Sequence, residues 1–463
     1  WCVGPDGVRR RAAVVAEELM EKPRSMDNLL DRAQQGTPII KGDRATFVWR
    51  GEQAPQLVGD MTGWQWGSPI DLSEVSPGVW AHTLTLPQDA YIEYALWDGE
   101  QRVADPLSGN VTPDGLGHEN HFFYMPGTSA TDLTRRRRNV PHGTVTRFVL
   151  ENDFLLAGPK RTVLLYRPPG EEPCPLLVVL DGQDYSRRAR ITHIVDNLIA
   201  QGRIRPIALA MPYHGRGARG VEYACSEATL CFLLLDLLEL AREELNLADL
   251  KTEPGAYGIL GASMGGLMAL YAGLRAPGVF GRVLAQSAAL DMSKPDSVVF
   301  DLVRHGPVPP LRLWMNVGRY EWLLDSNRRM HGLLEEKGYD VVYSEYHGGH
   351  NYPAWRNSGG EGLESRFGER GTLGGTRGLS GTGGEMASRL SASCARNPGQ
   401  RSESPEGRGT RGLGLRVRGR RRRNGSDPLY LQGGFVPVGQ DQLAARPYGT
   451  KRRPGHDRIA RPG

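Results

Sequence analysis

The chain has 463 residues, a formal net charge of +5 and a hydrophobic content of 39%. This length predicts two or three domains, and the composition is typical of a globular protein with a large core. No apolar run is long enough to cross a bilayer, so we expect no membrane partner. The five cysteines form no CxxC pair. We therefore expect neither disulfides nor a metal site, and we expect the reducing compartment of the cytoplasm.

The positive charge is concentrated at the C-terminal end. Residues 357–463 hold 19 Arg and 1 Lys against 9 acidic residues, a net charge of +11. Subtracting this from the total of +5 leaves −6 for residues 1–356. The part expected to fold is thus mildly acidic, and its charge gives no support for a nucleic-acid-binding protein.

The first third of the chain changes character twice. Residues 1–37 have helix-like apolar spacing and predict an N-terminal helical segment. Residues 38–126 contain short β-branched and aromatic runs, separated by Gly, Pro or Asp at intervals of about ten residues, which predicts a small all-β sandwich. Residues 127–141 include an arginine run at 135–138 and predict a linker.

Residues 142–356 alternate between predicted strands and predicted helices, which indicates an α/β domain with a mostly parallel sheet. The run at 174–180 is almost continuously apolar, as expected for a central strand covered on both faces. Residues 357–463 are rich in Gly, Arg and Ser and cannot form a core, so we expect a disordered tail.

A Gly-x-Ser-x-Gly motif lies at residues 261–265, between a predicted strand and a predicted helix. In this setting the motif is typical of a nucleophile elbow, in which the serine lies in a strained turn and the glycines avoid a clash. The start of a helix also favours negative charge. We therefore expect Ser263 to be a nucleophile and the N–H of Met264 to be an oxyanion donor. The alternative is a Gly-rich turn with an incidental serine.

A nucleophilic serine needs a histidine base, and the loop that follows the predicted strand at 341–346 offers two. This loop would return over the sheet edge beside the elbow, and the glycines at 348 and 349 let it bend. We expect His350 rather than His347 to be the base, because it lies further out in the loop. The alternative for either histidine is a polar loop residue.

The base needs an acid to orient it. Glu321 follows a glycine turn after the predicted strand at 311–317 and is the expected acid. Asp325 is the alternative acid, although its position favours a helix N-cap. The second oxyanion donor is expected at the backbone N–H of Gln183, which follows an early central strand.

Residues 142–356 resemble the enterochelin esterases and the esterase-D-like branch of the α/β hydrolases. The motifs that carry the resemblance lie at 142–145, 180–182, 219–223, 261–266 and 348–356. The resemblance implies an α/β-hydrolase fold, a serine esterase with Ser263, His350 and Glu321 as its triad, and no cofactor. Such proteins usually close with an amphipathic helix after Trp355-Arg356, and we expect the Gly/Arg-rich tail to replace that helix here.

The sandwich resembles the immunoglobulin-like N-terminal domain of the same esterases and the related domains of glycogen-branching enzymes. The segments that carry this resemblance lie at 58–64, 78–80, 94–99 and 105–107. The tryptophans of this domain could form a sugar platform, but aromatic residues usually pack the cores of small sandwiches, and we favour packing. These tryptophans are Trp64, Trp66, Trp80 and Trp97.

Loops at the carboxyl ends of the strands should form the mouth of the site. The substrate-binding residues expected there are Arg187, Arg188, Arg216, Arg219 and Trp355. Clustered arginine favours an anionic substrate, and a ferric catecholate siderophore would fit both charge and ester chemistry. The alternatives are solvated loop arginines and, for Arg219, an internal pair with Glu222.

The partner expected from this pattern is therefore a small-molecule ester, with no nucleic acid and no membrane. Two other functions stay open at this point. One is a carbohydrate esterase that removes feruloyl or acetyl groups while the sandwich binds sugar. The other is an inactive carbohydrate-binding protein.

Overall fold

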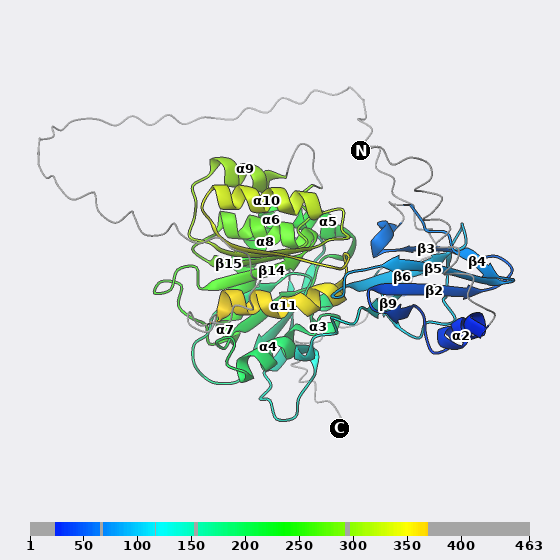
Figure 1. The fold of residues 1–463 in the computed structure, drawn as a ribbon. Helices are drawn as coiled ribbons and strands as arrows, with labels where there is room; N and C mark the ends of the chain where they lie inside the picture. The colour runs from blue at the N-terminus through cyan, green and yellow to red at the C-terminus, as the bar shows by residue number, and fades with distance from the viewer. Residues whose placement is uncertain (1–23, 65–67, 116, 152–155, 292–296, 369–463) are drawn as a thin grey trace, which may run out of the picture. The chain divides into compact units, whose positions relative to one another are not determined.

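The computed structural model describes residues 24–64, 68–115, 117–151, 156–291 and 297–368. In this part of the chain the early elements are mainly strands, and the later ones alternate between strands and helices (Figure 1). The part of the predicted N-terminal helical segment that is described contains helix α2 (Arg24–Ala33). Residues 1–23 of that segment and residues 369–463 of the predicted tail lie outside the described residues.

Two antiparallel sheets form the N-terminal domain, one with the strand order β1-β2-β5-β4 and the other with the order β3-β6-β9-β8, where β7 pairs with β6. The strands are β1 (Ile39–Lys41), β2 (Arg44–Arg50), β3 (Gln56–Gly59), β4 (Ser73–Ser76), β5 (Val79–Thr85), β6 (Tyr91–Trp97), β7 (Arg102–Val103), β8 (Val111–Pro113) and β9 (Glu119–Tyr124). Phe47, Tyr94 and Phe123 pack edge to face in the core between them, with ring centroids 5.0 to 6.1 Å apart. The predicted all-β N-terminal domain is confirmed.

Two of the four tryptophans singled out in the sandwich, Trp64 and Trp80, make hydrogen bonds within it. The indole N–H of Trp80 donates to the carbonyl of Gly51 over 3.1 Å, and that of Trp64 donates to Asp60 over 2.9 Å. These internal bonds favour packing over a sugar platform. Trp66 lies outside the described residues.

The second domain is built on an eight-stranded sheet with the order β10-β11-β13-β12-β14-β15-β16-β17. Its strands are β10 (Thr144–Glu151), β11 (Lys160–Arg167), β12 (Leu176–Val179), β13 (Ala208–Pro212), β14 (Tyr257–Ala262), β15 (Phe280–Gln286), β16 (Arg312–Gly318) and β17 (Asp340–Tyr346). The pairs from β13 to β17 are parallel, whereas β10 and β11 add antiparallel pairs at one edge. The mostly parallel sheet predicted from the sequence is confirmed.

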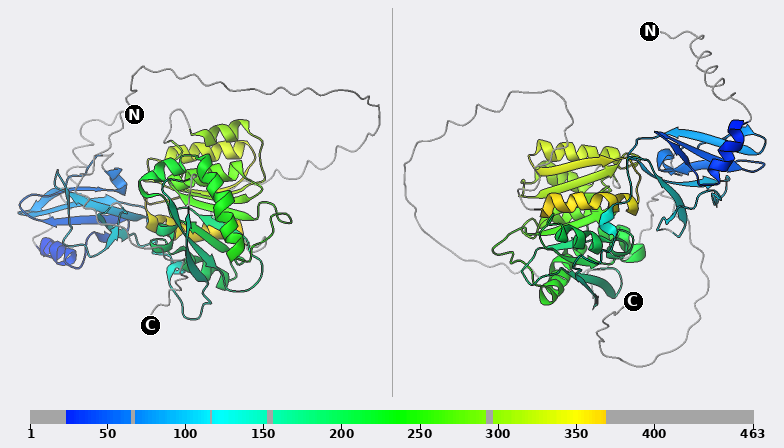
Figure 2. Two further views of the ribbon diagram at one scale, coloured as in Figure 1. Left: turned by 180° about the vertical axis from the view of Figure 1, so that it is seen from behind. Right: turned by 60° about the horizontal axis from the view of Figure 1, so that its bottom comes forward.

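Helices cover both faces of this sheet (Figures 1 and 2). On one face lie α8 (Met264–Arg275), α9 (Val298–His305) and α10 (Leu324–Glu336), and on the other lie α3 (Gly182–Arg187), α4 (Ile191–Ala200) and α11 (Tyr352–Phe367). The shorter helices α5 (Arg219–Tyr223), α6 (Glu227–Phe232) and α7 (Leu238–Glu244) add to the α8 side. Successive residues of β12 point into the two cores alternately, as a strand buried on both faces requires.

Helix α11 corrects the domain end expected from the sequence. We expected the folded domain to stop at Arg356 and its closing helix to be missing, but α11 continues to Phe367. Leu363 and Phe367 are buried in the core on this face. A Cβ at Gly362 would lie 2.7 Å from the ring of Trp314. The glycines that suggested a tail therefore let the helix approach the sheet closely.

The C-terminal end of α11 is held from the neighbouring strands. Arg282 donates through Nε to the carbonyl of Arg366 over 3.0 Å, and Arg312 donates to the carbonyl of Ser365 over 3.4 Å. Cations at this end of a helix satisfy its last carbonyls and oppose the negative end of its dipole. The two arginines thus help to fix where the domain ends.

Candidate active site

Ser263 lies in the turn between β14 and α8. Its backbone has φ 58° and ψ −123°, a strained conformation outside the regions that non-glycine residues usually adopt. A Cβ at Gly261 would overlap the backbone of Gly265, which explains the first glycine of the motif. The Ser263 side chain is partly exposed and does not cap α8. This is the geometry of a nucleophile elbow, with its hydroxyl left available.

His350 and Glu321 form a close pair in the loops after β17 and β16. Nδ1 of His350 lies 2.6 Å from Oε2 of Glu321, whose side chain is fully buried. Because a carboxylate only accepts hydrogen bonds, Nδ1 carries the proton. Nε2 is then the ring nitrogen that can accept a proton.

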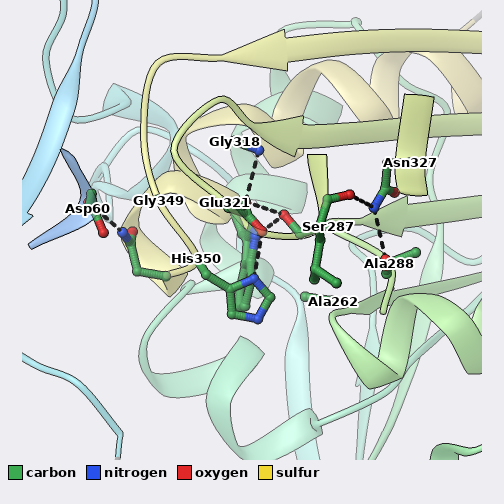
Figure 3. Close-up of polar contacts among 12 residues, drawn as sticks. Asp60, Ala262, Ser287, Ala288, Gly318, Glu321, Asn327, Gly349 and His350 are labelled. Atoms are coloured by element: carbon green, nitrogen blue, oxygen red, sulfur yellow. Dashed lines mark hydrogen bonds and ion pairs between the residues drawn. The ribbon is translucent and has the colours of Figure 1, made fainter. Parts of the chain in front are cut away.

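The other carboxylate oxygen of Glu321 is held by three donors, among them Ser287 and Gly318, which Figure 3 labels. Oε1 accepts hydrogen bonds from Ser287 Oγ at 2.7 Å, the backbone N–H of Gly318 at 2.8 Å and the Tyr346 hydroxyl at 2.8 Å. Hydrogen bonds to a carboxylate are strong, and together they fix its direction. Glu321 can therefore orient His350 with little freedom of its own.

Two tryptophans enclose the imidazole of His350. The Trp355 ring meets it edge to face at 4.8 Å, and the Trp322 ring lies 4.7 Å away at 43°. Trp355 is 5% exposed and donates its indole N–H to Ser287 Oγ over 2.9 Å. Trp355 is therefore buried against His350, whereas we expected it to line the mouth of the site and bind substrate. Trp322 is 54% exposed and was not singled out from the sequence.

The alternative base and acid lie elsewhere. Nδ1 of His347 pairs with Asp89 of the sandwich at 2.8 Å. Asp325 is exposed in the first turn of α10, whose N-cap is Leu323, so the expectation that Asp325 caps this helix is wrong. The geometry thus brings together His350 and Glu321 and separates their alternatives.

Met264 and Gln183 begin helices that follow neighbouring strands. Met264 is the first residue of α8, after β14, and Gln183 is the second residue of α3, after β12, which pairs with β14. N–H groups in a first helical turn have no partner within the helix. A Cβ at Gly182 would overlap Met211 of β13, so glycine is needed where α3 starts. Both residues therefore lie in first helical turns that follow two paired strands of the sheet.

Arg219 is bound to a buried acid. Its Nε and Nη2 donate to the two carboxylate oxygens of Asp181 over 2.8 and 2.7 Å, and Asp181 is 1% exposed. Burial lowers the pKa of Arg219, but its bonds to Asp181 outweigh that effect and raise the pKa above its usual value. The alternative pair with Glu222 is wrong, because Glu222 binds Arg161 at 2.6 Å.

The other predicted arginines differ in their surroundings. Arg188 donates to the carbonyl of Pro113 over 2.9 Å and lies 4.4 Å above the Tyr352 ring. Arg187 is exposed. The side chain of Arg216 lies outside the described part of the structure. Arg187 is therefore exposed to solvent, whereas Arg188 and Arg219 bind other residues of the chain.

Sequence reasoning missed Ser287 and Tyr346. Ser287 follows the last residue of β15, and Tyr346 ends β17. Both strands flank β16, which leads to Glu321. Polar residues at the carboxyl ends of neighbouring parallel strands were the available signal, because such ends converge on one edge of the sheet.

Within the described ranges, no helix has the length and apolar character needed to cross a membrane. The same ranges contain no group of three or more His, Cys, Asp or Glu side chains that could bind a metal ion.

The chain is similar in sequence to known esterases. The Esterase family model matches residues 156–358. The iron(III) enterobactin esterase of Dickeya dadantii is 26% identical over 70% of this chain and 88% of its own length. The iron(III) salmochelin esterase of Escherichia coli O6:H1 is 25% identical over 68% of this chain and 85% of its own length.

Solved structures show the same fold. The ferric enterobactin esterase of Salmonella typhimurium has a TM-score of 0.61 and 22% identity, over 70% of this chain and 93% of that one. The enterobactin esterase of Shigella flexneri, in the presence of enterobactin, has a TM-score of 0.58 and 21% identity, over 69% and 92%. The chain is thus similar in sequence to these esterases and has their α/β-hydrolase fold with an all-β N-terminal domain, and it is a carboxylic ester hydrolase.

Proposed function

We propose that the chain is a serine esterase in which Ser263 is the nucleophile, His350 the base and Glu321 the acid. The observation that carries the proposal is the 2.6 Å pair between His350 and the buried Glu321. This pair lies in the loops after β17 and β16 of the sheet whose β14 ends at the Ser263 elbow. The chain order serine, acid, histidine is that of an α/β hydrolase.

The reaction proceeds in two covalent stages. Nε2 of His350 takes the proton of Ser263 as Oγ attacks the ester carbonyl, and the same nitrogen then protonates the leaving alcohol. Water, activated by His350, hydrolyses the acyl-enzyme and releases Ser263. Throughout, Glu321 keeps the ring oriented and stabilises its charged form.

The N–H groups of Met264 and Gln183 form the oxyanion hole in this proposal. Their support is their position in the first turns of α8 and α3, where neither has a helical partner. Donors that are fixed before the reaction stabilise the negative charge that develops on the carbonyl oxygen, at no cost in reorganisation.

The substrate we propose is a ferric siderophore with ester linkages. Two relatives are named as esterases of iron(III) enterobactin and iron(III) salmochelin. The exposed Arg187 supplies positive charge suited to an anionic ligand. The engaged tryptophans of the sandwich give the carbohydrate alternatives no comparable support.

The proposed location is the cytoplasm. Three cysteines of the described residues, Cys174, Cys225 and Cys231, carry free thiols. Free thiols are typical of a reducing compartment.

The test is hydrolysis of ferric enterobactin and of p-nitrophenyl acetate by the full chain and by its Ser263→Ala and His350→Ala variants. Product is followed by chromatography for the siderophore and by absorbance for nitrophenol. We expect turnover of both esters and a loss of at least about 1,000-fold in kcat for each variant. Turnover of p-nitrophenyl acetate alone would contradict the siderophore, and full activity of the variants would contradict the proposed triad.

A further inference from the structure

The segment at 58–64 of the sandwich meets the loop that carries His350. It forms the end of β3 and the short helix η1 (Asp60–Thr62). A Cβ at Gly59 would lie 2.5 Å from the carbonyl oxygen of Glu93, so glycine lets this turn approach β6. The result is that Asp60, at 2% exposure, is buried against the strand.

Asp60 is bound within its own domain by two donors. The backbone N–H of Glu93 donates to Oδ2 over 2.8 Å, and the Trp64 indole N–H donates to Oδ1 over 2.9 Å. A buried carboxylate is costly unless it is hydrogen-bonded. Burial and the charge of Glu93 still raise the pKa of Asp60 well above its usual value.

The same carboxylate contacts the loop that carries the proposed base, on both sides of it. Before His350, a Cβ at Gly349 would overlap the Asp60 carboxylate, so only glycine leaves room for it. After His350, Nδ2 of Asn351 donates to Oδ2 of Asp60 over a long 3.5 Å. Figure 3 shows Asp60 at the loop that holds Gly349 and His350.

The direction of the Asn351 amide is fixed independently. Its Oδ1 accepts the backbone N–H of Ala354 over 3.0 Å and so caps α11. With the oxygen turned to the helix, the NH₂ group faces Asp60. One side chain therefore joins the start of α11, the residue after His350 and the sandwich.

A second contact holds the opposite end of this loop. The backbone N–H of Tyr91 donates to the carbonyl of His347 over 2.9 Å, and Asp89 pairs with the His347 ring. The Asp89 side chain is 62% exposed, so this ion pair contributes little, as exposed pairs generally do. Asp60 is the buried carboxylate of the set.

We propose that Asp60 is a positioning residue for His350, so that the sandwich domain completes the active site of the hydrolase domain. This inference rests on the proposed role of His350 as the base. Asp60 contacts neither substrate nor reacting atoms in this account. It holds Gly349 and Asn351 in place, and thereby keeps Nε2 of His350 on the path of the Ser263 proton.

The test exchanges the Asp60 carboxylate and the Asn351 amide, which contact each other. In the full chain, Asn351→Asp keeps an oxygen that caps α11 but sets a second carboxylate against Asp60, whereas Asp60→Asn removes the acceptor's charge. We expect each single variant to lower kcat for p-nitrophenyl acetate about 10- to 100-fold, because small displacements of a catalytic group are costly, with KM changed less than about threefold. The double variant restores a donor and an acceptor across the contact. We expect it to recover only part of the lost kcat, because the new amide NH₂ also replaces the oxygen that accepts the Glu93 N–H.

The double-mutant cycle separates positioning from damage to the fold, since independent defects would multiply and would not cancel. Asp89→Ala is the matched control. It removes a different carboxylate of the sandwich, one that contacts the same loop through His347 but is exposed. We expect it to change kcat less than about twofold. Single variants with unchanged kcat, or a double variant no better than the product of the singles, would overturn the inference. Loss of the proposed function would appear differently, as full activity in His350→Ala.

Discussion

The hydroxyl of Ser287 donates a hydrogen bond to Oε1 of Glu321 over 2.7 Å, and Oγ of Ser287 in turn accepts the indole N–H of Trp355 over 2.9 Å. These bonds connect the acid to a tryptophan that packs against His350. Ser287→Ala removes one of three donors to Oε1 and leaves the Trp355 N–H without an acceptor. We expect kcat to fall about 10- to 150-fold, in line with roughly 1.5 to 3 kcal/mol for a hydrogen bond to a charged group. Steady-state kinetics checks this, and an unchanged kcat would show that Glu321 is held sufficiently by Gly318 and Tyr346.

The elbow predicts a sharp contrast between two glycines. At Gly261 an added Cβ would overlap the backbone of Gly265, whereas at Gly332, on α10, nothing lies within 4 Å. We expect Gly261→Ala to destabilise the chain by about 3 kcal/mol or to prevent folding. Gly332→Ala should instead stabilise it by about 0.5 to 1 kcal/mol through helix propensity. Thermal unfolding of both variants checks the contrast, and equal midpoints would contradict the packing described at the elbow.

The pair between Arg219 and Asp181 gives a prediction about stability. Arg219→Ala leaves Asp181, which is 1% exposed, as an uncompensated buried charge. Breaking such a pair typically costs about 3 to 5 kcal/mol. The exposed pair between Arg275 and Glu227 is the control, and Arg275→Ala should cost less than about 1 kcal/mol. Denaturant unfolding measures both, and a small loss for Arg219→Ala would indicate that the arginine is held for substrate, as the sequence first suggested.

Trp322 predicts a dependence on the acyl group of the substrate. Its ring lies 4.7 Å from His350, yet 54% of the residue is exposed, so a planar ring of a bound ester can stack on it. Aromatic pairs are worth about 0.5 to 1.5 kcal/mol beyond the area they bury. We expect Trp322→Ala to lower kcat/KM for p-nitrophenyl benzoate about 2- to 10-fold more than for the acetate, and Trp322→Phe to recover the difference. Equal losses for both esters would place its effect on His350 alone.

A buried carboxylate of the sandwich predicts how stability changes with pH. Burial raises the pKa of Glu93 from 4.5 to about 7, although Asn120 and Tyr91 donate to it. The folded chain then binds a proton more tightly than the unfolded chain. The free energy of unfolding should therefore fall as the pH rises between about 4.5 and 7, and stay lower above that range. Glu93→Gln should flatten this fall in thermal unfolding measured from pH 5 to pH 8, and an unchanged slope would assign it to other groups such as Asp60.

Features formed by residues close together in the sequence could be predicted, and features formed by contacts between distant segments could not. The Ser263 elbow is local, since its strain and its glycines lie within residues 261–265, and the structure has that turn. The pairing of Glu321 with His350 required only the rule that carboxyl ends of parallel strands meet at one edge. The geometry agrees with that prediction.

Features set by contacts between distant segments were missed or mistaken. Asp60 and Asn351 are 291 residues apart, and nothing in the segment at 58–64 indicates the loop that Asp60 contacts. The bond between Arg219 and Asp181 was missed, because the burial of Asp181 cannot be seen in a sequence. Helix α11 was cut short because its glycines resemble a tail until the ring of Trp314 is placed against Gly362.

The central claim is that Ser263 is activated by His350 and Glu321 and carries the acyl group. The most direct measurement is intact-mass analysis of the full chain after treatment with a fluorophosphonate, followed by peptide mapping and by hydrolysis of p-nitrophenyl acetate on the same samples. We expect one adduct, on Ser263, together with loss of hydrolysis, and no adduct at this site in Ser263→Ala or His350→Ala. A folded chain that hydrolyses the ester but is labelled at another residue, or that is not labelled at all, would contradict the central claim.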